Sequence, residues 1–420
     1  MTRKDPVRRV RSRPTLTRQQ SFALTAAVAA IALWTSAAPS LTYPLYESQW
    51  GLTAAVTTAI FAIYPIVLVV MLILFGNVSD YIGFRTTILL GLTASLVGVV
   101  LFAVAPNVWW VFIGRGLMGV GVALSLSPAT AAAIEFSPPG RSGFARSITT
   151  AATAVGYGLA VLVGGALVQY APFPLHLNFW VLSVVIAVVI AFAIFLPTGS
   201  EPELRKKWRP TGFTFPRGHR RFVIVGTAAI TSAYTMAVVM ISLGAQIAGE
   251  LVGSTNELVN GGVIGLNALA IGVTAIVSRS LKPRTSVFLG AIGSLAGLLS
   301  IVGASTVQSL PLLLVAAVIL GAGYSLLFSG GLGVVGLSTL TTKRAGMLSA
   351  AYLVAYLGQG TTALSIGAIA TSQNLTVALV EGSVAIGLLS VITAVLAFVL
   401  LPARTFMDQP RAEAPLGSKE

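Results

Sequence analysis

Long apolar runs alternate with short polar connections along almost the whole chain. A helix that crosses a membrane needs about 20 predominantly apolar residues, and twelve segments of this kind can be placed. We expect the first six near residues 21–43, 52–75, 86–105, 108–134, 147–169 and 176–196. We expect the second six near residues 222–247, 258–278, 286–305, 310–338, 347–370 and 375–401.

This pattern predicts an all-α membrane protein of twelve transmembrane helices in two six-helix bundles. The expected domains are a basic cytosolic tail, an N-terminal bundle, a cytosolic linker, a C-terminal bundle and a cytosolic tail, at residues 1–20, 21–196, 197–221, 222–401 and 402–420. The basic N-terminus followed by an apolar run also resembles a signal peptide. That run continues to Tyr43, which is long enough to span, so we expect a retained first helix.

The composition excludes several classes of protein. Of the 420 residues, 55% are hydrophobic and only 9% are charged, against about 25% charged in soluble domains. The chain has no cysteine, and His176 and His219 fall in predicted loops, so we expect neither a metal site nor a thiol nucleophile. There is also no glycine-rich phosphate loop with a lysine and no nucleophile–base set. We therefore expect no enzyme, no cofactor and no coupling to ATP.

The basic residues predict the orientation. If the N-terminus is cytosolic, all 26 Lys and Arg residues except Arg115 lie in the tails or in loops on the cytosolic side. This is the distribution that the positive-inside rule requires. It also explains the net charge of +14 without nucleic acid. We expect a multi-pass protein of the cell membrane with both termini in the cytoplasm.

Two glycine pairs recur at matching places and predict an internal repeat. Gly119 and Gly121 in the fourth predicted span match Gly321 and Gly323 in the tenth. In each half an Arg-x-Gly loop and a second glycine pair follow at nearly the same distance. Two like six-helix halves of this kind are typical of one class of secondary transporter.

A ten-residue loop, residues 76–85, connects the second and third predicted spans, which must therefore be antiparallel neighbours. Gly76 and Gly83 permit a tight turn, and Asp80 and Arg85 place both signs of charge at the membrane edge. A loop that only turned would not need both charges. We therefore expect this loop to bind another part of the protein in one conformation and to release it in another.

This loop resembles the signature loop between helices 2 and 3 of the major facilitator superfamily. The chain keeps four positions of that signature, Gly76, Asp80, Gly83 and Arg85, and departs from it at Tyr81 and Phe84. Arg115 and Gly119 resemble a second family pattern, Arg-x-x-x-Gly. Glu135, Pro138 and Arg141 resemble a third family pattern. The run from Tyr43 to Leu52 resembles bacterial exporter-like members.

The resemblance implies a latch at the cytosolic side. In the family the matching Asp contacts the start of helix 11, which in this chain lies beside Arg344, and closes the inside. The expected latch residues are Gly76, Asp80, Gly83, Arg85, Glu135, Arg141 and Arg344. The alternative is a solvated turn in which Asp80 only caps a helix.

Arg115 lies about seven residues, or roughly 10 Å, into its helix. A charge at that depth is costly unless it faces protein or water. It is expected either to couple protons or to hold an anionic substrate; the alternative is an arginine that extends to the headgroups or bonds helix carbonyls. No carboxylate is expected deep in helices 1, 4, 7 or 10, which favours a neutral, anionic or amphipathic substrate over a simple cation.

Family geometry implies a central cavity lined by helices 1, 4, 7 and 10. Polar and aromatic side chains suited to amphipathic ligands occur there and on helix 11. The candidates are Trp34, Thr35, Ser36, Pro39, Met118, Tyr234, Gln246, Tyr324, Ser325, Ser329, Tyr352, Tyr356 and Gln359. The alternative for each is ordinary packing between helices.

The sequence thus favours a monomeric secondary active transporter that moves a small organic molecule by alternating access, with proton-coupled efflux as the first hypothesis. A uniporter or importer of a neutral or anionic metabolite is the alternative. A non-transporting membrane sensor or scaffold is a third hypothesis, which the lack of a long polar domain disfavours.

Overall fold

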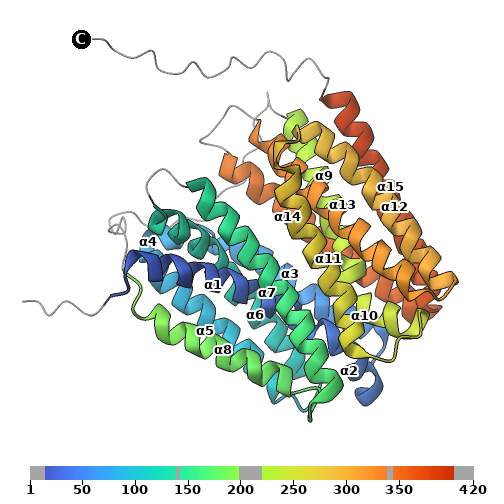
Figure 1. Ribbon diagram of the computed structural model, residues 1–420, viewed down its shortest axis with the longest axis horizontal. Coiled ribbons are helices and arrows are strands. Elements are labelled where there is room, and N and C mark those ends of the chain that lie inside the picture. The colour runs from blue at the N-terminus through green and yellow to red at the C-terminus, as the bar shows by residue number, and fades with distance from the viewer. Residues whose placement is uncertain (1–14, 139–141, 198–219, 338–343, 402–420) are drawn as a thin grey trace, which may run out of the picture.

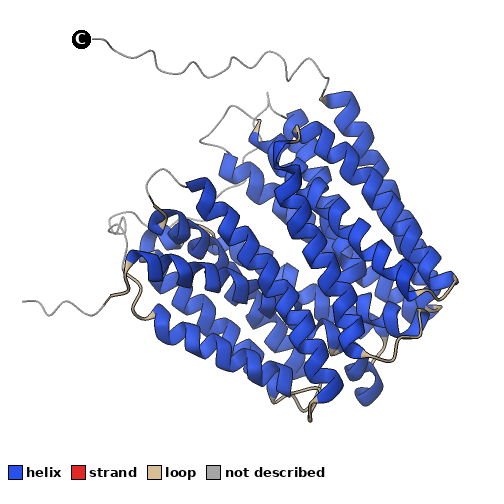
Figure 2. Cartoon of the chain, viewed as in Figure 1, coloured by secondary structure: helices blue, strands red, loops and turns tan. Residues whose placement is uncertain are grey.

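The computed structural model of the protein describes residues 15–138, 142–197, 220–337 and 344–401. These residues form helices joined by short loops and contain no strand (Figure 2). Eleven of their helices are long and apolar enough to cross a membrane, and α8 is a shorter apolar helix. The predicted all-α membrane fold is confirmed.

The N-terminal half contains six main helices. They are α1 (Arg18–Ala37), α3 (Ala54–Phe75), α5 (Phe84–Ala103), α6 (Val108–Phe136), α7 (Ser142–Tyr170) and α8 (Leu177–Ala193). The first span continues beyond α1 through a 3₁₀ turn, η1 (Ala38–Leu41), and a short helix, α2 (Tyr43–Trp50). One turn of helix, α4 (Ser79–Ile82), lies in the loop after α3.

The C-terminal half repeats this order. Its main helices are α9 (Arg220–Ile241), α11 (Glu257–Val277), α12 (Pro283–Thr306), α13 (Leu310–Gly336), α14 (Arg344–Ser372) and α15 (Leu375–Leu400). Three short elements, α10 (Gly244–Gln246), η3 (Ile247–Leu251) and η4 (Ser278–Ser280), follow α9 and α11. Every predicted span overlaps one main helix. The helix α1 begins three residues earlier than expected and α9 two residues earlier, inside the predicted tail and linker.

The predicted glycine repeat has a packing basis. A Cβ at Gly119 would lie 2.8 Å from the Tyr64 carbonyl oxygen of α3, and one at Gly321 would overlap the Asn267 carbonyl of α11. The partner glycines face the third helix of each half: Gly121 meets α5, and Gly323 meets α12. Each pair therefore lets one helix approach two neighbours closely, and it does so in both halves.

The two halves meet at one end of the molecule and diverge toward the other (Figure 1). We call the end that carries α2 and α10 the closed end, and the end that carries the start of α1 and the end of α15 the splayed end. Two helix pairs join the halves, α3 with α14 and α7 with α11. An arrangement that is closed at one end and splayed at the other is one of the two states that alternating access requires.

Candidate functional site between the two halves

Arg115 is enclosed by three helices of the N-terminal half. Its side chain is only 1% exposed, and its guanidinium carbon lies 4.6 Å from the centre of the Tyr64 ring. Gly119, one turn further along α6, lets α3 come close enough to place that ring over the cation. The Arg-x-x-x-Gly spacing therefore builds a buried cation–π contact, which is worth about 2 kcal/mol when desolvated.

The backbone of α1 supplies the main acceptor for Arg115. One terminal nitrogen, Nη1, donates to the Ser36 carbonyl oxygen over 2.9 Å and lies 4.0 Å from the Met118 sulfur. Pro39, the second residue of the 3₁₀ turn, has no amide hydrogen and so cannot donate to the carbonyl of Ser36, three residues earlier. Arg115 Nε is buried without a hydrogen-bond partner. Among the described residues no carboxylate pairs with this charge.

Five aromatic residues of the C-terminal half surround one another. Tyr234 from α9 lies at the centre, with ring centroids of its neighbours 4.7–6.3 Å away. Its hydroxyl contacts that of Tyr356 over 3.5 Å. The aromatic cluster consists of Tyr234, Tyr324, Phe328, Tyr352 and Tyr356. Sequence analysis had singled out the four tyrosines but had missed Phe328, which has no polar tip and follows Tyr324 by one helical turn.

The helix α14, which carries Tyr352 and Tyr356, packs against α3 of the N-terminal half, which carries Tyr64. In α7 of the same half, the Tyr157 hydroxyl is buried without a hydrogen-bond partner. The helix that places a ring over Arg115 is therefore the one that packs against the helix of two members of the aromatic cluster. Flat rings with hydroxyl tips and one cation can bind an amphipathic molecule by stacking, hydrogen bonds and charge.

The remaining cavity candidates occupy mixed positions. Trp34 and Thr35 are buried in α1, and their polar atoms lack hydrogen-bond partners. Ser325 and Gln359 are also buried, on α13 and α14. Ser329 is half-buried and bonds the Leu326 carbonyl of its own helix over 3.5 Å. The structure therefore groups the four tyrosines, places Ser36 beside Arg115, and leaves Ser325 and Ser329 on α13 outside the aromatic cluster.

Gln246 lies at the closed end and not beside the aromatic cluster, which differs from its expected place. Its Nε2 donates to Glu47 Oε2 over 2.6 Å, joining α10 to α2 across the two halves. The Thr57 hydroxyl donates to the other oxygen of Glu47. Burial and the nearby carboxylate of Glu47 raise the pKa of Glu250.

We expect a Gln246→Ala variant to loosen the closed end. It leaves a half-buried carboxylate without its donor from the other half, which costs about 1–3 kcal/mol. The chain has no cysteine, so Ser40→Cys, at a position only 3% exposed, can report opening by its labelling rate with an impermeant maleimide. The labelling rate should rise about tenfold in Gln246→Ala. It should stay unchanged in the control Gln49→Ala, which changes an exposed glutamine near Glu47.

Small residues seal the closed end beside this hydrogen bond. A Cβ at Gly165 would lie 2.7 Å from the Glu257 carbonyl oxygen, and one at Gly261 would overlap the Val161 carbonyl. The Glu257 amide also donates to Gln169 Oε1 over 2.7 Å. On the other side of the molecule, the Ala55 amide donates to Thr371 Oγ1 over 2.8 Å. Backbone-to-backbone contact along α7 and α11 thus closes this end.

The expected latch residues lie at the splayed end, where Asp80 is exposed in the single turn of α4. Gly83 has φ of 80°, a conformation that favours glycine, and it caps α5. Gly76 ends α3, and Arg85 is half-buried in the first turn of α5. The loop therefore has the tight turn that was predicted. The contact with α14 that the resemblance implies stays a prediction.

Glu135 ends α6 with its side chain exposed. Arg18, which sequence analysis passed over as part of the tail, donates to the carbonyls of Glu135, Phe136 and Ser137. A cation at the end of a helix satisfies carbonyls that lack helical partners. Arg141 and the side chain of Arg344 lie outside the described residues.

Two like halves of six helices, joined at one end and splayed at the other, define a membrane transporter and not an enzyme. The chain belongs to the Major Facilitator Superfamily, whose family model matches residues 23–302. The family resemblance drawn from the sequence is confirmed.

Two curated relatives match part of the chain. It is 33% identical over 126 residues to the multidrug resistance protein Stp of Mycobacterium tuberculosis, which covers 29% of this chain and 24% of that protein. It is 32% identical over 124 residues to the puromycin resistance protein pur8 of Streptomyces alboniger, which covers 29% and 23%. The matched stretch thus spans about a quarter of the length of these relatives.

Solved structures match nearly the whole chain. A bacterial homolog of the human lysosomal transporter Spinster, inward-facing and unoccupied, has a TM-score of 0.72 at 17% identity, over 94% of this chain and 99% of that one. The nucleoside transporter NupG has a TM-score of 0.71 at 13% identity, over 92% and 100%. These likenesses establish the fold.

Proposed function

We propose that the protein is a proton-coupled exporter of small amphipathic organic molecules. The observation that carries this proposal is the buried Arg115 over the Tyr64 ring of α3, a helix that packs against α14 of the other half, which carries Tyr352 and Tyr356 of the aromatic cluster. Stacking surfaces and a cation at one interface suit a ligand with a flat apolar body and polar groups. Two of the curated relatives are named for resistance to drugs, and they support export as the direction.

The splayed end is proposed to face the cytosol of a cell-membrane protein with both termini inside. The distribution of Lys and Arg supports this orientation. In that orientation the structure is the inward-facing state, ready to receive a substrate from the cytosol. A cysteine introduced between residues 402 and 420 should then react with an impermeant reagent only after cells are permeabilised.

Reconstitution into liposomes tests the function. We expect uptake of puromycin and a panel of aromatic amines into vesicles that hold protein with its splayed end outward. A pH gradient with the acidic side inside the vesicle should speed that uptake at least fivefold. Vesicles without protein serve as the control for passive leakage. A panel that shows no protein-dependent flux under either condition would contradict the proposal.

A second candidate is a uniporter of a neutral or anionic metabolite. The observation in its favour is that the charge of Arg115 has no carboxylate partner among the described residues and has a free Nε. A substrate carboxylate or phosphate would supply the missing counter-charge. Protein-dependent flux of organic anions that ignores the pH gradient would favour this function over export.

The loop at Asp80 is proposed to latch the splayed end when it closes, with the carboxylate at the positive N-terminal end of α14. Asp80 is exposed in the present state. Asp80→Asn should therefore weaken only the proposed contact with α14, which forms when the splayed end closes. We expect transport below a fifth of the wild-type rate and slower labelling of the Ser40→Cys reporter. Ser79→Ala, in the same turn, is the control. Wild-type transport by Asp80→Asn would reject the latch.

A further inference from the structure

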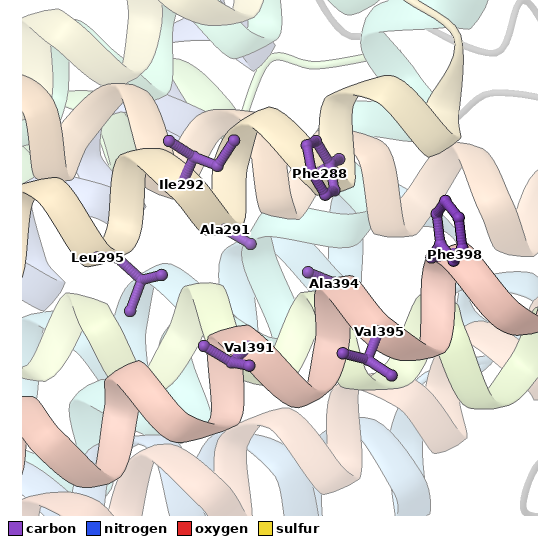
Figure 3. A pocket seen from close by; sticks show the side chains of 8 residues that line it. All are labelled: Phe288, Ala291, Ile292, Leu295, Val391, Ala394, Val395 and Phe398. Carbon is purple, nitrogen blue, oxygen red and sulfur yellow. The ribbon is translucent and has the colours of Figure 1, made fainter.

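A hollow on the lipid-facing surface lies between α12 and α15. Eight side chains line it, all of them apolar, around a volume of about 290 Å³ (Figure 3). Ala291 and Ala394 face each other at its floor, and the small size of both residues makes it concave. Phe288 and Phe398 stand at one end, and Leu295 and Val391 lie toward the other.

This groove starts at the splayed end and runs into the membrane. Phe288 is one turn beyond Arg284 at the start of α12, while Phe398 lies in the last turn of α15. From Phe288 to Leu295 the groove extends about 10 Å along the helix axis. An apolar hollow of that length and direction matches the upper part of a lipid acyl chain that hangs from the headgroup layer.

A cation stands at the mouth of the groove. The Arg284 guanidinium carbon lies 5.2 Å from the centre of the Phe398 ring, and Nη2 donates to the Phe398 carbonyl oxygen over 3.5 Å. A guanidinium has five donor hydrogens, so most remain available. Arg279 and Lys282, both exposed, precede it in the same connection. No acidic residue occurs in the sequence between Glu257 and Glu381, so this connection offers no internal counter-charge.

We infer that the α12–α15 groove is a binding site for an anionic phospholipid, with an acyl chain against the two alanines and the phosphate at Arg284. The apolar lining selects a hydrocarbon chain, and the cluster of three cations selects a negative headgroup. Basic pockets between transmembrane helices bind anionic lipids on the same physical grounds. The site lies on the outer surface of the C-terminal half, away from the aromatic cluster, and is independent of the transported substrate.

Native mass spectrometry of the full-length purified protein tests the site with two probes. These are phosphatidylglycerol and phosphatidylcholine with the same palmitoyl and oleoyl chains. We expect the protein to retain one phosphatidylglycerol at least fivefold better than one phosphatidylcholine. Arg284→Gln should remove that preference through the headgroup. Ala394→Leu should reduce retention at least fivefold by filling the floor, and Val395→Trp fills the same groove from a more exposed position if Ala394→Leu does not fold.

Matched controls separate this site from general lipid contact. Arg221→Gln removes another cation that lies over a phenylalanine ring, 4.9 Å from Phe222, at the start of α9. Ala191→Leu enlarges an exposed alanine of α8 in the other half. Both should retain phosphatidylglycerol as the wild type does. Equal retention by Arg284→Gln and wild type, equal loss in Arg284→Gln and Arg221→Gln, or a doubled protein mass that shows the groove covered by a second copy would each overturn the inference.

Discussion

A Gly261→Val variant is expected to transport at less than a tenth of the wild-type rate. The end of the molecule that carries α2 and α10, which is closed in this structure, is expected to stay open in the variant. A Cβ at this position would overlap the carbonyl oxygen of Val161, and a backbone atom in the middle of α7 cannot move aside as a flexible side chain can. The closed state therefore loses several kcal/mol relative to its alternative, which is enough to invert an equilibrium of a few kcal/mol. Labelling of the Ser40→Cys reporter should become at least tenfold faster.

The adjacent glycine provides the control. A Cβ at Gly262 would meet nothing within 4 Å, so Gly262→Val makes the same chemical change on the other face of α11. It should transport and label as the wild type does. If both variants transport normally, the contact between α7 and α11 does not close this end. If both fail equally, the defect lies in α11 itself and not in its contact with α7.

The second large effect is expected at Arg115. An Arg115→Met variant should lose at least tenfold in transport, which corresponds to about 1.4 kcal/mol, while its melting temperature stays equal or rises. The charge is buried without a carboxylate partner among the described residues, and replacing buried ionic groups by apolar ones of similar volume is often neutral or stabilising. Loss of function without loss of stability would show that the charge acts in transport.

Two measurements accompany this variant. The pH dependence of the remaining flux in vesicles should disappear if Arg115 takes part in proton coupling. Met118→Leu, a change of nearly constant volume at the side chain beside Arg115, should keep both the rate and the pH dependence. Full transport by Arg115→Met would reduce Arg115 to a packing residue, and a variant that no longer folds would make its role structural.

Much of the fold could be predicted because a bilayer imposes length and charge rules on sequence. The twelve spans and the glycine repeat follow from apolar runs and small residues. The helical extension of the first span at the closed end was missed because Tyr43–Trp50 includes Glu47, Ser48 and Gln49, whose polarity ends the apolar run. It is nevertheless helical, with Pro44 near its start and Gly51 in a left-handed conformation at its end.

The candidate site was less predictable, for reasons of geometry. A charge inside an apolar run marks Arg115 from sequence alone, but its acceptor is a backbone carbonyl, which any residue at position 36 would offer. The pairing of Glu47 with Gln246 joins residues 199 positions apart, and no local pattern encodes such a distance. One signal was available. Both residues end the first span of their half, so the internal repeat places them at equivalent corners.

The 3₁₀ turn around Pro39 has a mechanical consequence. The same short stretch of backbone holds the acceptor of Arg115 at Ser36 and, just beyond the turn, carries the Glu47 carboxylate that bonds the opposite half. A change of charge near the guanidinium is therefore expected to shift the backbone that also positions Glu47, and so to affect the hydrogen bond between α2 and α10 at the closed end. One short stretch of backbone thus links the buried arginine to the closed end.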